Sequence, residues 1–203
     1  MHKRIHQEFE RICSKRNITG SVLEVGSLPN DRSLLCMKSL DGASEKVGIN
    51  LNGPYEFRDF RIHKGNANDM ECFEDERFDL VLCNAMLEHD PYFWKSIAEI
   101  KRVTRPGGLV IIGVPGYKRS GTINKIQKTL DKIPVIRKLE DSRLFNFLFT
   151  GTLTFKVHSA PGDYYRFSPQ AIKKVFFEGM DNVHVWSIMQ PPRLIGIGTK
   201  KAS

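Results

Sequence analysis

The segment at residues 78–84 reads Phe-Asp-Leu-Val-Leu-Cys-Asn, a nearly continuous apolar run. A strand with one face in water alternates apolar and polar residues, whereas a strand buried on both faces does not. Strands of the second kind occur in parallel sheets whose helices cover both faces. Residues 78–84 therefore predict a buried strand of an α/β fold.

Strand and helix patterns alternate along most of the chain. This alternation predicts an open, doubly wound, mainly parallel sheet of seven strands with helices on both faces. The last two strands are joined without a helix, so we expect them to be antiparallel. We predict strands at residues 21–26, 46–51, 60–64, 78–84, 109–114, 182–188 and 194–199, and helices near residues 5–18, 34–40, 91–103 and 168–177.

The length of 203 residues fits one domain, 1–203, with an N-terminal helix within 1–18 and an insertion at 116–162. No apolar run approaches the roughly 20 residues that span a bilayer. The charged N-terminus does not resemble a secretory signal, so we expect a cytoplasmic protein. The four cysteines form no C-x-x-C pair, and we therefore expect no metal site.

Polar and mostly uncharged residues follow the predicted strands. Open parallel sheets bind ligands beyond the carboxyl ends of their strands, so these turns should form the site. They hold few lysines or arginines and no G-x-x-x-x-G-K-[ST] phosphate loop. Gly26 stands alone where a dinucleotide fingerprint needs three glycines. A nucleoside without phosphates therefore fits these turns better than NAD or ATP.

Four segments, in the right order and spacing, resemble the class I S-adenosylmethionine-dependent methyltransferases, close to the type 11 group. Residues 22–26 resemble the opening motif, in which glycine follows an acidic residue two positions later. Residues 78–89 and 102–108 are similar to the fourth- and fifth-strand motifs, and residues 163–169 recur in some of these enzymes before the sixth-strand helix. The resemblance covers nearly the whole chain and implies a methyltransferase fold, S-adenosylmethionine as cofactor and methyl transfer as the reaction.

The resemblance also implies roles for single residues. Leu28 and Asn30 replace later glycines of the family's first turn, and Asn50 stands where the family usually has a carboxylate. The implied cofactor contacts are Glu24 and Gly26 at the methionine end, Asn50 at the ribose, Leu51 on the adenine face, Asn66 and Ala67 at the adenine edge, and Asn84 at the methionine amino group.

Methyl transfer mainly requires alignment and exclusion of water, and a hydroxyl acceptor also needs a general base. His89 and His158 are candidate bases, because imidazole titrates near neutral pH. His89 could equally be a helix-entry residue bonded to backbone. Tyr164, Tyr165 and Arg166 are candidate substrate contacts, or else a packing corner that anchors the next helix.

The insertion at residues 116–162 interrupts the core, and we expect it to act as a lid that sets acceptor specificity. Its nine Lys and Arg outnumber its three Asp and Glu, within a chain of formal net charge +8. Basic and apolar residues interleave there, which suits an anionic membrane surface or a lipid-linked phosphate. The same pattern suits a helical cap whose lysines stay in water. No nucleic-acid module is recognisable, which disfavours nucleic acid as a partner.

Three functions stay open at this point. The first is methyl transfer to a small-molecule or glycan-like acceptor. The second is a binding or regulatory protein that kept the fold and lost catalysis, suggested by Leu28, Asn30 and Asn50. The third is a membrane-surface methyltransferase of a lipid-linked acceptor, suggested by the basic insertion.

Overall fold

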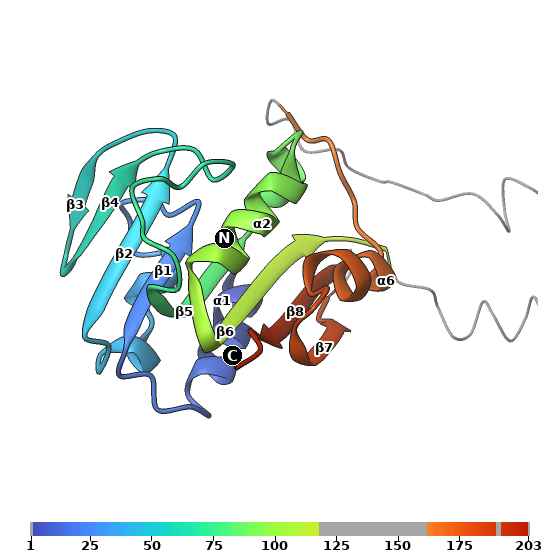
Figure 1. The fold of residues 1–203 in the computed structure, drawn as a ribbon, viewed down its shortest axis with the longest axis horizontal. Helices are drawn as coiled ribbons and strands as arrows, with labels where there is room; N and C mark the ends of the chain where they lie inside the picture. The colour runs from blue at the N-terminus through green and yellow to red at the C-terminus, as the bar shows by residue number, and fades with distance from the viewer. Residues whose placement is uncertain (1, 118–161, 190–191, 203) are drawn as a thin grey trace, which may run out of the picture. The chain divides into compact units, whose positions relative to one another are not determined.

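The computed structural model describes residues 2–117, 162–189 and 192–202. Within these ranges a single sheet of eight strands has the order β3-β4-β2-β1-β5-β6-β8-β7 (Figure 1). Strands β4, β2, β1, β5 and β6 are parallel, β3 is antiparallel to β4, and β8 is antiparallel to both β6 and β7. The strands are β1 (Ser21–Val25), β2 (Glu45–Asn50), β3 (Tyr55–Phe57), β4 (Phe60–Lys64), β5 (Phe78–Asn84), β6 (Thr104–Pro115), β7 (Asp181–Ser187) and β8 (Arg193–Thr199).

The predicted mainly parallel α/β sheet is confirmed, as is the antiparallel pairing of the last two strands. The predicted number of seven strands is wrong, because the described residues also include β3 at the sheet edge. β3 is only three residues long and largely exposed, so it has no buried face that an apolar pattern could reveal. It is held by pairing with β4 through a short hairpin.

Helices cover both faces of the sheet. On one face, α1 (Lys3–Cys13) packs together with the short 3-10 helices η1 (Leu34–Cys36) and η2 (Lys38–Leu40). On the other face lie α2 (Phe93–Val103), the short α6 (Pro169–Ala171) and the π-helical η4 (Ile172–Phe176) (Figure 1). No helix in the described ranges is both long and apolar enough to span a bilayer.

Two predicted helices differ from the structure. Residues 34–40 form two 3-10 turns because Met37, between them, is extended with ψ of 136° and ends the first turn. The helix predicted from Ser168 to Phe177 starts as one α-helical turn and widens into η4. The N-terminal helix ends at Cys13, earlier than residue 18. The predicted lid at 116–162 lies outside the described residues apart from positions 116, 117 and 162.

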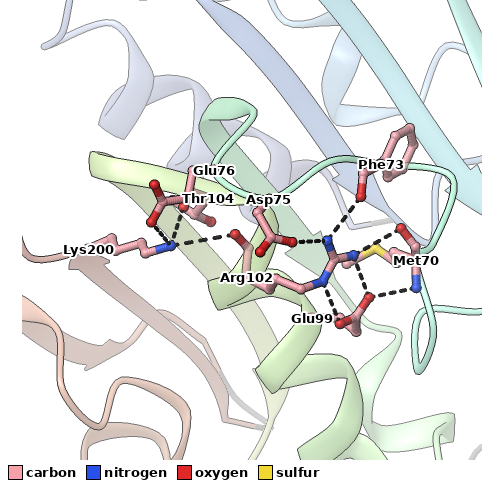
Figure 2. Close-up of polar contacts among 8 residues, drawn as sticks. All are labelled: Met70, Phe73, Asp75, Glu76, Glu99, Arg102, Thr104 and Lys200. Atoms are coloured by element: carbon pink, nitrogen blue, oxygen red, sulfur yellow. Dashed lines mark hydrogen bonds and ion pairs between the residues drawn. The ribbon is translucent and has the colours of Figure 1, made fainter.

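Arg102 on α2 fixes the long connection between β4 and β5 (Figure 2). Its guanidinium donates to the carbonyls of Met70 and Phe73, each at 3.0 Å, and to the carboxylates of Asp75 and Glu99 at 2.6–2.8 Å. Glu99 in turn accepts a hydrogen bond from the Met70 amide at 2.7 Å. The connection begins with the predicted adenine contacts, so this network holds part of the candidate site in place.

Candidate active site

Gly26 brings the turn after β1 against the turn after β5. Its φ of +82° lies in the left-handed region that favours glycine. A Cβ atom at this position would lie 3.0 Å from the Cβ and Cγ atoms of Met86, tighter than nine in ten real Cβ contacts. The Gly26 amide also donates to the Ile49 carbonyl in β2 at 2.9 Å. A side chain at position 26 would therefore strain the backbone and push the two turns apart.

The Glu24 carboxylate holds the turn after β1 from within. The residue is 7% exposed and accepts hydrogen bonds from the Ser27 hydroxyl at 2.9 Å, the Leu34 amide at 3.1 Å and the Ser33 hydroxyl. Burial raises the pKa of Glu24, and these hydrogen bonds act in the opposite direction. Glu24 therefore shapes the backbone that the resemblance assigns to the methionine end.

Asn50, at the end of β2, ties its own turn to the turn after β1. Its side-chain amide donates to the Ser27 carbonyl at 2.8 Å, and its side-chain oxygen accepts from the Asn52 amide at 3.0 Å. A carboxylate could not donate to the Ser27 carbonyl, which gives a physical reason for asparagine at this position. Leu28 and Leu51, in these two turns, are 54% and 66% exposed, so neither side chain is packed inside its turn.

The turn after β4 is anchored to the start of α2. Asn66 accepts from the Asn68 amide at 3.0 Å, and Ala67 packs against the core. The Asn68 side chain donates to Asp90 at 2.7 Å and to the Ser96 hydroxyl at 2.8 Å, and Ser96 donates to Asp90 at 2.6 Å. This cluster ties the turn that carries Asn66 and Ala67 to the start of α2.

The last residue of β5 and the first residue of the turn after it lie in constrained positions. Ala85 has a φ of +53°, a left-handed conformation that is uncommon for alanine, and its amide donates to the Gly113 carbonyl at 2.8 Å. A Cβ atom on Gly113 would lie 2.5 Å from the side-chain oxygen of Asn84, so the Asn84 amide lies over β6. Strained backbone of this kind often occurs at functional sites.

Glu88 and His89 follow in the 3-10 helix η3 (Leu87–His89). Glu88 is 2% exposed, and its Oε1 lies 3.3 Å from Nη1 of Arg193 and 4.0 Å from Nε2 of His89. The Glu88 carbonyl accepts hydrogen bonds from the amides of Tyr164 and Tyr165 at 2.9 and 3.2 Å. Burial raises the pKa of Glu88, whereas Arg193 and His89 lower it.

Tyr165 packs against the start of α2, as in the alternative in which residues 164–166 anchor the next helix rather than contact substrate. Its ring contacts Phe93 with centroids 5.0 Å apart, and its hydroxyl donates to the Pro91 carbonyl at 3.0 Å. Arg166 donates to the Tyr165 carbonyl at 2.8 Å. Tyr164, in contrast, is 58% exposed and can contact a ligand. Of the three predicted substrate residues, Tyr165 and Arg166 thus make contacts within the fold, and Tyr164 is exposed.

The structure brings the turns after β1, β2, β4 and β5 to one edge of the sheet, as the strand order requires. His158 lies outside the described residues, so its predicted role stays a prediction. The sequence alone assigned no role to Asn68, Glu88 or Arg193. Asn68 and Glu88 carried a local signal, since each follows a predicted strand, whereas Arg193 is 105 positions away from Glu88.

Residues 35–112 match the family described as a methyltransferase domain. Comparison with curated proteins gives no match. A Methanosarcina mazei S-adenosylmethionine-dependent methyltransferase has a TM-score of 0.56 at 16% identity, covering 100% of this chain and 99% of that one. The Burkholderia thailandensis 1,6-didemethyltoxoflavin-N1-methyltransferase, solved with its namesake compound and S-adenosylhomocysteine, has a TM-score of 0.58 at 15% identity, covering 95% and 78%. The Haemonchus contortus phosphoethanolamine N-methyltransferase 2, solved with phosphomonomethylethanolamine and S-adenosylhomocysteine, has a TM-score of 0.62 at 11% identity, covering 98% and 53%.

At these identities the structural likeness shows the fold, and the matching family adds the kind of domain. The fold is that of the class I S-adenosylmethionine-dependent methyltransferases, and residues 35–112 match a methyltransferase domain. The family match and the fold together support an S-adenosylmethionine-dependent methyltransferase, as the resemblance of the motifs predicted.

Proposed function

We propose that this protein transfers the methyl group of S-adenosylmethionine to a small-molecule or glycan-like acceptor, at the carboxyl edge of the sheet. The observation that carries the proposal is the close approach of Gly26 to Met86. Because a side chain at position 26 would crowd Met86, glycine presents backbone where the methionine part of the cofactor would lie. The described turns around this point carry mainly uncharged groups, which suits an adenosine without phosphates.

The cofactor would be held by residues of four turns. One N–H of the Asn50 side chain donates to the Ser27 carbonyl. Its second N–H and a lone pair of its oxygen can bind the ribose hydroxyls. Leu51 is exposed and can lie against the adenine face. The other proposed contacts are Gly26, in the turn held by Glu24, then Asn66 and Ala67 at the adenine edge, and Asn84 at the amino group.

The bound cofactor supplies an electrophilic methyl group on a sulfonium sulfur. The protein then has to orient the acceptor in line with that methyl group and to exclude water. The turn after β5 lies next to this point and carries His89, whose role as a base stays a prediction. Tyr164, whose amide donates to the Glu88 carbonyl, would add a contact to the acceptor.

Exposed aromatic side chains near the start of α2 support an acceptor with a ring. Tyr92, Trp94 and Tyr164 are 52%, 50% and 58% exposed. The rings of Tyr92 and Trp94 meet edge to face with centroids 5.8 Å apart. Faces of this kind can stack on a planar ring or on the apolar face of a sugar. Two of the similar solved enzymes hold small molecules, 1,6-didemethyltoxoflavin in one and phosphomonomethylethanolamine in the other.

Calorimetry with S-adenosylmethionine and S-adenosylhomocysteine tests the proposal. We expect one saturable site for each compound in the wild-type protein, and loss of that site in Gly26→Ala. If neither compound binds at about millimolar concentration, where only affinities stronger than about −4 kcal/mol register, the protein is instead a binding or regulatory protein that kept the fold.

The basic insertion at residues 116–162 lies almost wholly outside the described residues, so its proposed lid and membrane-surface roles rest on the sequence pattern. Co-sedimentation with liposomes that contain or lack anionic lipid tests the membrane role, and indifference to anionic lipid would contradict it. A cytoplasmic location remains part of the proposal.

A further inference from the structure

Glu88 carries a buried carboxylate that the proposed cofactor contacts do not use. The residue is 2% exposed, and its Oε1 faces Arg193 at 3.3 Å. Its Oε2 is also buried and has no hydrogen-bond partner among the described residues. A buried oxygen left without a partner destabilises a fold, and more so when the group is charged. Such an atom calls for a proton or a ligand.

The position of Glu88 places this oxygen on the acceptor side of the candidate site. Glu88 follows β5, whose last residue, Asn84, is the proposed contact for the methionine amino group. Arg193 is the first residue of β8 and pairs with Pro115 at the end of β6. The carboxylate therefore lies beyond the ends of β5, β6 and β8, away from the turns after β2 and β4 that would hold the nucleoside.

Several contacts fix the carboxylate at this place. The amides of Tyr164 and Tyr165 bind the Glu88 carbonyl, and Arg193 binds one carboxylate oxygen. Arg193 is itself largely buried, with 17% of its side chain exposed. A group held by its backbone and by one oxygen can present the other oxygen in a fixed direction, as proton transfer requires.

We propose that Oε2 of Glu88 accepts the proton of the group that is methylated, so that the acceptor presents an N–H or O–H to this atom. This inference rests on the proposed function. Glu88 Oε2 would take the proton as the acceptor's nitrogen or oxygen bonds to the methyl carbon. The electron pair of the broken carbon–sulfur bond stays on sulfur, and Glu88 later returns the proton to water.

The proposal excludes acceptors without such a hydrogen and gives Glu88 priority over His89 as the base. Burial favours the protonated form of Glu88 and so strengthens its basicity relative to an exposed glutamate. Arg193 is a positioning residue, because it contacts Glu88 rather than the reacting atoms.

NMR of the full-length protein, labelled with ¹³C at the glutamate carboxyl carbons, tests the proposal without knowledge of the acceptor. The protein is saturated with S-adenosylhomocysteine and titrated with methylammonium or ethylene glycol, which supply N–H and O–H donors. Tetramethylammonium is the matched control, because it has the same charge as methylammonium and no N–H. The Glu88 signal is assigned by its loss in Glu88→Gln or, if that variant does not fold, by its shift in Arg193→Gln.

We expect the Glu88 signal to move saturably with methylammonium or ethylene glycol and to stay fixed with tetramethylammonium. The signal of Glu99, whose carboxylate already binds Arg102 and the Met70 amide, should not move. No saturable shift with either donor, or an equal shift with tetramethylammonium, would overturn the proposal. Binding of S-adenosylhomocysteine is measured separately by calorimetry, and its absence would contradict the proposed function. In that case the Glu88 signal is followed in the cofactor-free protein.

Discussion

The side-chain amide of Asn50 donates a hydrogen bond to the backbone carbonyl of Ser27 at 2.8 Å. This bond joins the turn after β2 to the turn after β1, whose other support is the buried carboxylate of Glu24. The two turns that would hold the nucleoside are therefore fixed to each other. An apparent departure from the family pattern thus serves the geometry of the same site.

Replacing Asn50 by aspartate should weaken both the fold and cofactor binding. The carboxylate cannot donate to the Ser27 carbonyl and would repel it, so we expect a loss of about 1–2 kcal/mol in the free energy of unfolding. S-adenosylhomocysteine should bind less tightly, because the turn after β1 loses its tether. Chemical denaturation and calorimetry measure the two effects. The exposed Asn52 gives the control, Asn52→Asp, and tighter binding by Asn50→Asp would contradict the prediction.

Replacing Gly26 by alanine should lower the free energy of unfolding by more than the left-handed backbone conformation alone explains. Gly26 and Gly107 have φ values of +82° and +74°, but only Gly26 has a neighbour, Met86, within reach of a new Cβ. Gly107→Ala should therefore lose about 1 kcal/mol of stability from left-handed strain. Gly26→Ala should lose more and should also lose S-adenosylhomocysteine binding. Equal losses in the two variants, with binding retained in both, would show that the close approach is unimportant.

Replacing Arg102 by alanine should release the connection between β4 and β5 (Figure 2). The change leaves the Phe73 carbonyl without its donor. The Met70 carbonyl keeps only the Phe73 amide, and the Glu99 carboxylate keeps only the Met70 amide. We expect a loss of about 2–3 kcal/mol in the free energy of unfolding. Arg11→Ala, which removes the exposed ion pair with Glu8, should lose at most about 1 kcal/mol. Similar losses in the two variants would argue against a structural role for the Arg102 network.

Loss of Arg102 should also change how the fold responds to acid. The hydrogen bonds from Arg102 are the main reason that the pKa of Glu99 lies below its ordinary value. A lowered pKa contributes stability above the ordinary glutamate pKa, and this contribution is lost as pH falls through the lowered value. The difference in stability between the wild-type protein and Arg102→Ala should therefore become smaller as the pH falls. Thermal unfolding at several pH values measures this difference. An advantage that grows toward low pH would contradict this sign.

Glu88 should have the opposite pH dependence, because burial raises its pKa in the folded state. Its contribution is present below the ordinary glutamate pKa and is lost as pH rises through the raised value. The nearby groups that influence its pKa are Arg193 on β8 and His89 on η3, whereas the charge of Glu88 raises the pKa of the Cys83 thiol on β5. As the pH rises through the raised pKa of Glu88, the free energy of unfolding of the wild-type protein should therefore fall relative to that of Glu88→Gln. Thermal unfolding of both proteins and of a surface control, Glu178→Gln, measures the effect, and a constant difference would contradict it.

The sequence by itself determined the buried strands, their mainly parallel arrangement and the turns that carry the site. An apolar run such as residues 78–84 is buried on both faces wherever it forms a strand, so a local pattern suffices to predict it. The glycine at position 26 was also readable, because it follows a strand at the point where such sheets bind ligands.

Only the tertiary structure decided the contacts between turns and the edge of the sheet. Strand β3 exists through pairing with β4, and residues 34–40 follow 3-10 turns although their apolar spacing also suits an α-helix. The link from Asn50 to Ser27 and the pairing of Glu88 with Arg193 join residues 23 and 105 positions apart. The physical reason is that strand order, rather than local pattern, brings such residues together and buries them.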